Sequence, residues 1–163
     1  MTWVTAPKPA HDRNAVPMIR PATMADLPRV LEIEALSFPL PWTETHFASA
    51  LKNLFLVHQE DRITGFLVAL ADAATRGATI LKVAVHPEAR RRGVGTRLMR
   101  AALARFRELG LRRVELDVKI IRPEALKFYE KFGFQTVRVI PGDPEDDDDA
   151  LAFYGLRLEL TPA

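Results

Sequence analysis

The chain of 163 residues contains no cysteine. Disulfides, thiolate metal sites, iron–sulfur clusters and cysteine nucleophiles are therefore excluded together. The four histidines never stand four residues apart, so the sequence also lacks a helical zinc motif, and we expect no bound metal. No apolar run approaches the roughly 20 residues of a membrane span, and the N-terminal segment holds no apolar signal sequence. These absences predict a cytoplasmic protein without a membrane partner.

Charge of the two signs is nearly balanced, at 23 basic and 21 acidic residues, but it is unevenly placed. Residues 90–113 hold nine arginines and one acid, whereas residues 143–149 hold six acids and no base. Only Phe106 is aromatic in the arginine-rich segment, and it falls on an apolar stripe, so no platform for base stacking is present. Nucleic acid is therefore not an expected partner. The acidic run is interpreted as a solvated hairpin loop, with attraction of a cationic partner as the alternative.

One domain is expected, because a domain takes about 150 residues. We assign residues 18–163 to it and interpret residues 1–17, which hold three prolines and no periodic pattern, as a flexible tail. Periodicity and capping residues predict the secondary structure that follows. Strands are expected at 18–22, 54–59, 63–71, 79–85, 113–119, 135–140 and 151–160, and helices at 26–37, 43–51, 93–109 and 123–132.

The order of these elements predicts the fold class. The first helix is expected to bury Leu27, Val30, Leu31 and Ala35. A strand, a helix and a second strand follow one another in the middle of the chain, which predicts one parallel strand pair at the centre of a mixed sheet. The expected fold is therefore α/β in the broad sense, an α+β mixed sheet with helices on its faces.

The segment with the most candidate functional residues is 83–96, which reads VAVHPEARRRGVGT. A strand ends there, a short loop turns, and a helix opens on Gly93 and Gly95. Exposed amides at a helix start bind phosphate oxygens, and glycine removes the Cβ atom that would keep an anion away from the backbone. Three arginines immediately before the glycines add positive charge. The segment therefore predicts a phosphate-binding loop.

Three interpretations of this loop compete. A P-loop is excluded, because no Gly-Lys-Ser/Thr sequence follows. A dinucleotide site is disfavoured for two reasons: Leu98 occupies the third glycine position of that motif, and the loop lies in mid-chain. In its favour, Glu115 stands at the position of the acidic residue that binds the ribose in such sites. The third interpretation is a cradle for the pyrophosphate of coenzyme A.

A family resemblance supports the third interpretation. The pattern Arg-x-x-Gly-x-Gly, which ends at Gly95, resembles the acetyl-coenzyme A signature of the GNAT N-acetyltransferases. Residues 125–134 resemble the last helix of that family. Residues 38–47 and 116–118 resemble its branch that acetylates protein N-termini, including the ribosomal-protein-alanine N-acetyltransferases. The resemblance covers roughly residues 18–160 and implies a mostly antiparallel GNAT-like sheet with a splayed central parallel pair and about four helices.

The resemblance also implies the reaction and the residues that carry it. Acetyl-CoA would donate its acetyl group directly to a primary amine, such as the N-terminal α-amine of a ribosomal protein. Asp117 would be the general base, and Tyr129 would be the general acid for the leaving sulfur. Arg122 stands where the family usually has Asn, and Asp117 stands where the branch usually has Glu. The residues implied to bind the cofactor are Val83, Ala84, Val85, Arg90, Arg91, Arg92, Gly93, Val94, Gly95 and Thr96.

Several alternatives stay open at the level of sequence. Asp117 also fits a solvent-exposed position on a strand, and Tyr129 also fits a buried position on the apolar stripe of a helix. The acceptor could be a small-molecule amine. A non-catalytic module of the same fold, which senses coenzyme A or docks nucleic acid, is a further alternative. The oligomeric state, monomer or homodimer, also stays open.

Overall fold

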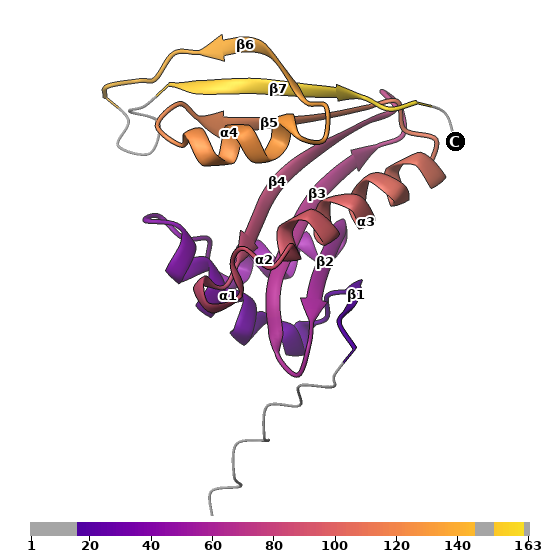
Figure 1. Cartoon of the computed structure of the whole chain (residues 1–163), viewed down its shortest axis with the longest axis vertical. Helices are drawn as coiled ribbons and strands as arrows, with labels where there is room; N and C mark the ends of the chain where they lie inside the picture. The colour runs from indigo at the N-terminus through magenta and orange to yellow at the C-terminus, as the bar shows by residue number, and fades with distance from the viewer. Residues whose placement is uncertain (1–15, 146–151, 162–163) are drawn as a thin grey trace, which may run out of the picture.

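The computed structural model describes residues 16–145 and 152–161. The predicted tail therefore lies almost wholly outside the described residues, as does most of the acidic run. A single sheet of seven strands runs in the order β1-β2-β3-β4-β5-β7-β6 (Figure 1). The strands are β1 (Met18–Pro21), β2 (Leu54–Gln59), β3 (Ile63–Asp72), β4 (Gly77–Val85), β5 (Arg113–Lys119), β6 (Gln135–Ile140) and β7 (Phe153–Glu159). The helices are α1 (Leu27–Ser37), α2 (Glu44–Ala50), α3 (Val94–Glu108) and α4 (Pro123–Glu130), with short 3-10 turns at Met24–Asp26 and Pro87–Ala89.

The centre of the sheet holds the predicted parallel pair. β4 and β5 pair in parallel, and the other neighbouring strands pair antiparallel. The mixed-sheet prediction is thus confirmed. The β4–β5 pairing covers only Gly77–Thr79 against Arg113–Glu115. β4 then continues to Val85 while β5 stays paired with β7, so the two strands are joined at one end and swing apart (Figure 1).

A β-bulge in β4 lies where the strands begin to diverge. Val68 of β3 pairs with Lys82, whereas the next residue of β3 pairs with Ile80, so Leu81 is an extra residue in β4. A bulge shifts the alternation of side chains between the two faces of a sheet. Ile80 accordingly packs in the core under α3, whereas Ala84 packs in the core under α1 and α2.

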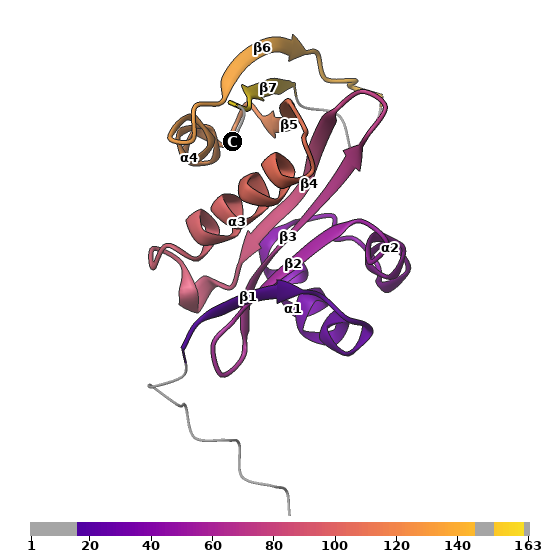
Figure 2. The same cartoon turned by 90° about the vertical axis from the view of Figure 1, so that its right-hand side faces the viewer.

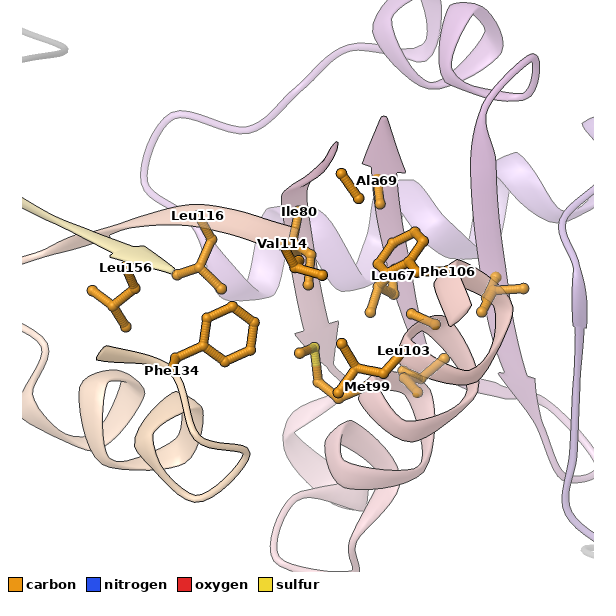
Figure 3. Packing of buried hydrophobic residues seen from close by; sticks show 14 of the residues in the cluster. Leu67, Ala69, Ile80, Met99, Leu103, Phe106, Val114, Leu116, Phe134 and Leu156 are labelled. Atoms are coloured by element: carbon orange, nitrogen blue, oxygen red, sulfur yellow. The ribbon is translucent and has the colours of Figure 1, made fainter. Parts of the chain in front are cut away.

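The helices form a layer on each face of the sheet. α3 and α4 cover one face, and α1 and α2 cover the other (Figure 2). The core under α3 runs without interruption from Phe106 and Leu67 to Leu116, Phe134 and Leu156, so it bridges the diverging strands (Figure 3). No helix among the described residues is long and apolar enough to cross a membrane.

The buried stripe of α1 differs from the prediction. Leu27 and Val30 are buried as expected, and Leu31 is partly buried against the same core. Ala35 is exposed, and Ile33 and Glu34 are buried in addition. Glu34 was not among the residues expected in the core, because a carboxylate is rarely buried without a charged partner. That partner comes from β4, as described below.

Candidate active site

The diverging end of β4 leaves one edge of the strand unpaired toward β5. Val83 and Val85 point into the core under α3, whereas the Ala84 side chain is buried on the opposite face. Ala84 can therefore contribute only its main chain to this edge. A strand edge offers backbone N–H and C=O groups to any extended partner with amide groups of its own. One such group, the Val85 carbonyl, accepts a hydrogen bond from Arg90 Nε at 3.1 Å.

The start of α3 follows directly after this edge. Gly93 is the N-cap, it adopts the left-handed conformation with φ of 78°, and no side chain caps the helix there. The first helical amide that bonds within this turn is that of Arg97, which donates to the Gly93 carbonyl at 3.0 Å. The amides of Val94, Gly95 and Thr96 precede it and lie at the positive end of the helix dipole. The Val94 side chain is buried, so this residue presents only its main chain.

The three arginines before the helix have different surroundings. Arg90 folds back onto β4 through the Val85 carbonyl. Arg92 forms an ion pair with Glu60 at 3.5 Å, which ties the loop to the β2–β3 turn. Arg91 is exposed and has a positive φ of 63°, so the loop reverses direction at this residue. All three lie within a few residues of the uncapped amides and keep the helix start electropositive.

The last helix, α4, packs against this helix start. A Cβ atom on Gly95 would lie 3.3 Å from Phe128 Cζ and 3.7 Å from Val85 Cγ2. Gly95 therefore lets α4 approach the junction of β4 and α3. By contrast, a Cβ atom on Gly93 would meet nothing within 4 Å. The two glycines of the motif thus serve different purposes, close packing at Gly95 and backbone conformation at Gly93.

Tyr129 lies on the same side of the sheet as this helix start. Its ring contacts Phe128 at 5.1 Å and Phe134 at 5.9 Å between centroids, both with edge-to-face geometry. Burial raises the pKa of its hydroxyl to about 12. The group therefore keeps its proton over the whole physiological pH range and can act as a proton donor.

Asp117 lies on the opposite side of β5, because its neighbours Leu116 and Val118 point into the core. Its side chain is half exposed, and Arg138 of β6 approaches it to 3.7 Å. Both residues pair with Gly155 of β7, which lies between them. A Cβ atom on Gly155 would lie 2.5 Å from Arg138 Cγ. The missing side chain of Gly155 therefore gives Arg138 its path to Asp117.

The predicted site residues thus form two groups around one gap. The cofactor-binding residues and Tyr129 lie at the junction of β4, α3 and α4, whereas Asp117 lies on the face that carries α1 and α2. Sequence reasoning assigned no role at the site to Phe128, Arg138 or Gly155. The sequence signal for the contact at Gly155 was a glycine in the middle of a strand, which often marks a close approach of another group.

Comparison with known proteins agrees with this arrangement. Residues 27–134 match the model of the acetyltransferase (GNAT) family. The chain belongs to the GNAT family of acetyltransferases. It is therefore an N-acetyltransferase, and the family takes its acetyl group from acetyl-CoA. The GNAT fold was predicted from the motifs, and this prediction is confirmed.

Individual relatives are N-acetyltransferases as well. The chain is 30% identical over 125 residues to a protein of Bacillus subtilis named as a candidate [ribosomal protein bS18]-alanine N-acetyltransferase, which covers 72% of this chain and 80% of the relative. An N-alpha-acetyltransferase of Sulfurisphaera tokodaii is 24% identical over 147 residues, 81% of this chain and 88% of the relative. The crystal structure of Ard1 from Thermoplasma volcanium superposes with a TM-score of 0.81 at 29% identity, over 89% of this chain and 98% of that one.

The residues present fit acetyl-CoA. The uncapped amides of α3 suit a pyrophosphate, and the unpaired edge of β4 suits the two amide groups of a pantetheine arm. A side chain at position 95 would enter the junction of β4, α3 and α4, close to Val85 and Phe128.

Proposed function

We propose that this GNAT enzyme acetylates the N-terminal α-amine of a protein, with a ribosomal protein as the expected class of acceptor. The two sequence relatives described above are named for acetylation of an alanine of ribosomal protein bS18 and for N-alpha-acetylation. The observation that carries the proposal is the divergence of β4 from β5 beside the uncapped start of α3. The acceptor would approach this gap from the face on which Asp117 lies, and acetyl-CoA from the face of α3 and α4.

The cofactor side would be built mainly from backbone. The amides of residues 94–96 would hold the pyrophosphate, and the edge of β4 at Val83 and Val85 would align the pantetheine arm. Arg90 and Arg91 would supply positive charge next to the pyrophosphate. When bound, acetyl-CoA supplies an activated thioester. The chain itself supplies orientation, because the amides are already fixed by the helix and need no rearrangement.

Proton transfer would be divided between the two sides. Asp117, on the face of α1 and α2, would accept a proton from the incoming amine, directly or through water. Tyr129, on the face of α3 and α4, would donate its proton to the leaving sulfur. The raised pKa of about 12 keeps this hydroxyl protonated before the reaction. The opposite placement of these residues suits an acceptor and a donor that approach from opposite faces.

An α-amine needs less help from a general base than a lysine side chain does. Its pKa of about 7.7–8.0 leaves a substantial neutral fraction at pH 7, whereas lysine, with a pKa of about 10.4, is almost wholly protonated. Asp117 is half exposed and lies 3.7 Å from Arg138. We therefore expect selectivity for α-amines over lysine side chains.

The experiment uses the full chain with acetyl-CoA and two matched peptides. One peptide begins with a free alanine and has every lysine blocked, and the other has a blocked N-terminus and one free lysine. Mass spectrometry then locates the acetyl group. Acetylation of the first peptide and not the second is the expected result. Acetylation of lysine alone, or of small amines alone, would overturn the proposed acceptor, and binding of acetyl-CoA without turnover would indicate a non-catalytic module.

A further inference from the structure

A fully buried carboxylate lies at the end of α1, away from the residues assigned so far. Glu34 has no solvent exposure. Lys82 Nζ lies 3.1 Å from each of its two carboxylate oxygens, and the Trp42 amide donates to Oε2 at 3.1 Å. The Lys82 side chain is only 13% exposed. One carboxylate therefore joins α1, the loop after α1 and β4, the last of which is 48 residues away in sequence.

Aromatic rings cover the cation of this pair. Lys82 Nζ lies 4.0 Å from the centroid of the Phe38 ring and 5.0 Å from that of Trp42. The guanidinium of Arg122, the N-cap of α4, lies 5.7 Å from the same Phe38 ring. Cation–π attraction is strongest where water is excluded, as it is here for Lys82. The segment Phe38–Trp42 is thus attached to β4 through Lys82 and to the start of α4 through Arg122.

The position of Lys82 connects this cluster with the gap. Lys82 is the first residue after the bulge in β4, so it belongs to the part of β4 that has left β5. Its partners come from α1 and from the loop after α1, on the face where Asp117 also points. The segment Phe38–Trp42 therefore borders the gap on the acceptor side and not on the side of α3.

We infer that the Glu34–Lys82 ion pair is a positioning device for the acceptor. It sets the place of the segment Phe38–Trp42 at the acceptor side of the gap. Stability alone is a poor explanation of the pair, because buried ion pairs can often be replaced by neutral groups without loss of stability. A defined geometry of the loop is what the pair adds. This inference rests on the proposed function.

The kinetic test compares two single variants with the double variant. Lys82→Met and Glu34→Gln each leave one buried group without its partner, whereas Glu34→Gln/Lys82→Met removes both charges and keeps the volumes. We expect each single variant to lower kcat/KM for the acceptor peptide on the order of 10- to 100-fold, with KM for acetyl-CoA within about twofold. The double variant should regain the wild-type Tm but not the acceptor kcat/KM.

Two outcomes of this test overturn the inference. One is a double variant that recovers acceptor kinetics together with Tm, because the charges then serve folding alone. The other is a rise in KM for acetyl-CoA equal to that for the acceptor. The matched control is Arg105→Met/Glu108→Gln, which removes an exposed ion pair on α3 at 3.2 Å with the same chemical changes. Both kinetic constants should stay at the wild-type values in this control.

A second measurement does not depend on activity. The chain has two tryptophans, so Trp42 is the only one in a Trp3→Phe background. In that background Lys82→Met should shift the Trp42 emission and increase its quenching by acrylamide about twofold or more, because the ring loses its cation and the loop loses its attachment. Unchanged emission and quenching would overturn the inference. If no amine is acetylated at all, the proposed function fails, and this measurement still tests the attachment of the loop.

Discussion

The two sides of the β4–β5 gap are built in different ways. The proposed cofactor side comes almost entirely from one continuous segment, residues 83–96, and it offers mainly backbone groups. The proposed acceptor side combines α1, the loop after it, β4, β5, β6 and the start of α4. Its parts are held by side chains, namely the Glu34–Lys82 pair and the contact of Arg138 with Asp117.

This difference explains why one side can be read from a motif and the other cannot. A backbone site needs only glycine at the right spacing and a helix start, both of which are local in sequence. A side-chain site needs residues that meet only in the folded chain, and many combinations of residues can serve. We therefore expect substitutions on the cofactor side to change KM for acetyl-CoA, and those on the acceptor side to change the acceptor constants.

The largest effect is expected at Tyr129, on the face of α3 and α4. Tyr129→Phe keeps the ring that packs against Phe128 and Phe134 and removes only the hydroxyl. If this hydroxyl protonates the leaving sulfur, kcat should fall on the order of 10²- to 10⁴-fold with KM for acetyl-CoA nearly unchanged. Steady-state kinetics with both substrates varied provide the measurement. Wild-type turnover in this variant would show that Tyr129 is only a core tyrosine.

The pH profile adds an independent check of Tyr129. Because the pKa of its hydroxyl is raised to about 12, the hydroxyl is almost fully protonated at every pH below about 11. The wild-type rate should therefore show no alkaline decline from this group between pH 7 and about 10. A decline that disappears in Tyr129→Phe would contradict the assignment of so high a pKa.

A smaller effect is expected on the acceptor side at Asp117. Asp117→Asn should lower kcat/KM for the acceptor about 10- to 100-fold at pH 7, less than for a typical base, because part of the α-amine is already neutral. The deficit should shrink as the pH rises through the amine pKa of about 7.7–8.0. Glu115→Gln is the matched control, since Glu115 is on the same face but pairs with Arg157 at 3.0 Å. Identical pH profiles for Asp117→Asn and wild type would show that Asp117 is a solvent-exposed strand residue and not the general base.

The sequence predicts the fold closely, for physical reasons that differ between elements. The bounds of β2 and β5 match the expected 54–59 and 113–119, because strict alternation and flanking turn residues mark a strand locally. Glu34 was missed, because its burial depends on Lys82 48 residues away. The Asp117–Arg138 contact was missed for a similar reason, since it needs β7 to place Gly155 between them.

A further prediction distinguishes the role of Gly95 from that of Gly93. Gly95→Ala places a Cβ atom 3.3 Å from Phe128 Cζ, so the Phe128 ring, which packs against Tyr129, must give way by a few tenths of an ångström. We expect KM for acetyl-CoA to rise about tenfold and kcat to fall as well. Gly93→Ala meets nothing within 4 Å but strains a backbone with φ of 78°, so it should cost about 1 kcal/mol of stability. Equal effects of both variants on kcat would contradict a role of Gly95 in seating α4.

The smallest effect concerns the stability of the cofactor side and comes from His58. This histidine is fully buried next to the first turn of α3, with Nδ1 2.7 Å from Thr64 Oγ1 and Nε2 3.5 Å from the Arg97 guanidinium. Burial, together with Arg97, lowers its pKa below 6.5 in the folded state. Well above pH 6.5 the ring is neutral in both states and contributes no pH dependence. Below that value the unfolded chain binds a proton that the folded chain resists, so the free energy of unfolding should fall by at most about 1.4 kcal/mol per pH unit.

Thermal unfolding of wild type and His58→Gln between pH 7 and 5 measures this contribution. The wild-type Tm should decline below pH 6.5, and the decline should be shallower in the variant, even though the variant is less stable overall. Asp26 does not interfere, because its pKa is lowered from 3.8 to about 2 by Arg20, and its stabilisation is lost only as the pH falls through that range. Parallel declines in both proteins would show that His58 titrates freely in the fold. A saturating concentration of acetyl-CoA should raise the Tm of both proteins equally if the cofactor side binds it through backbone amides and not through His58.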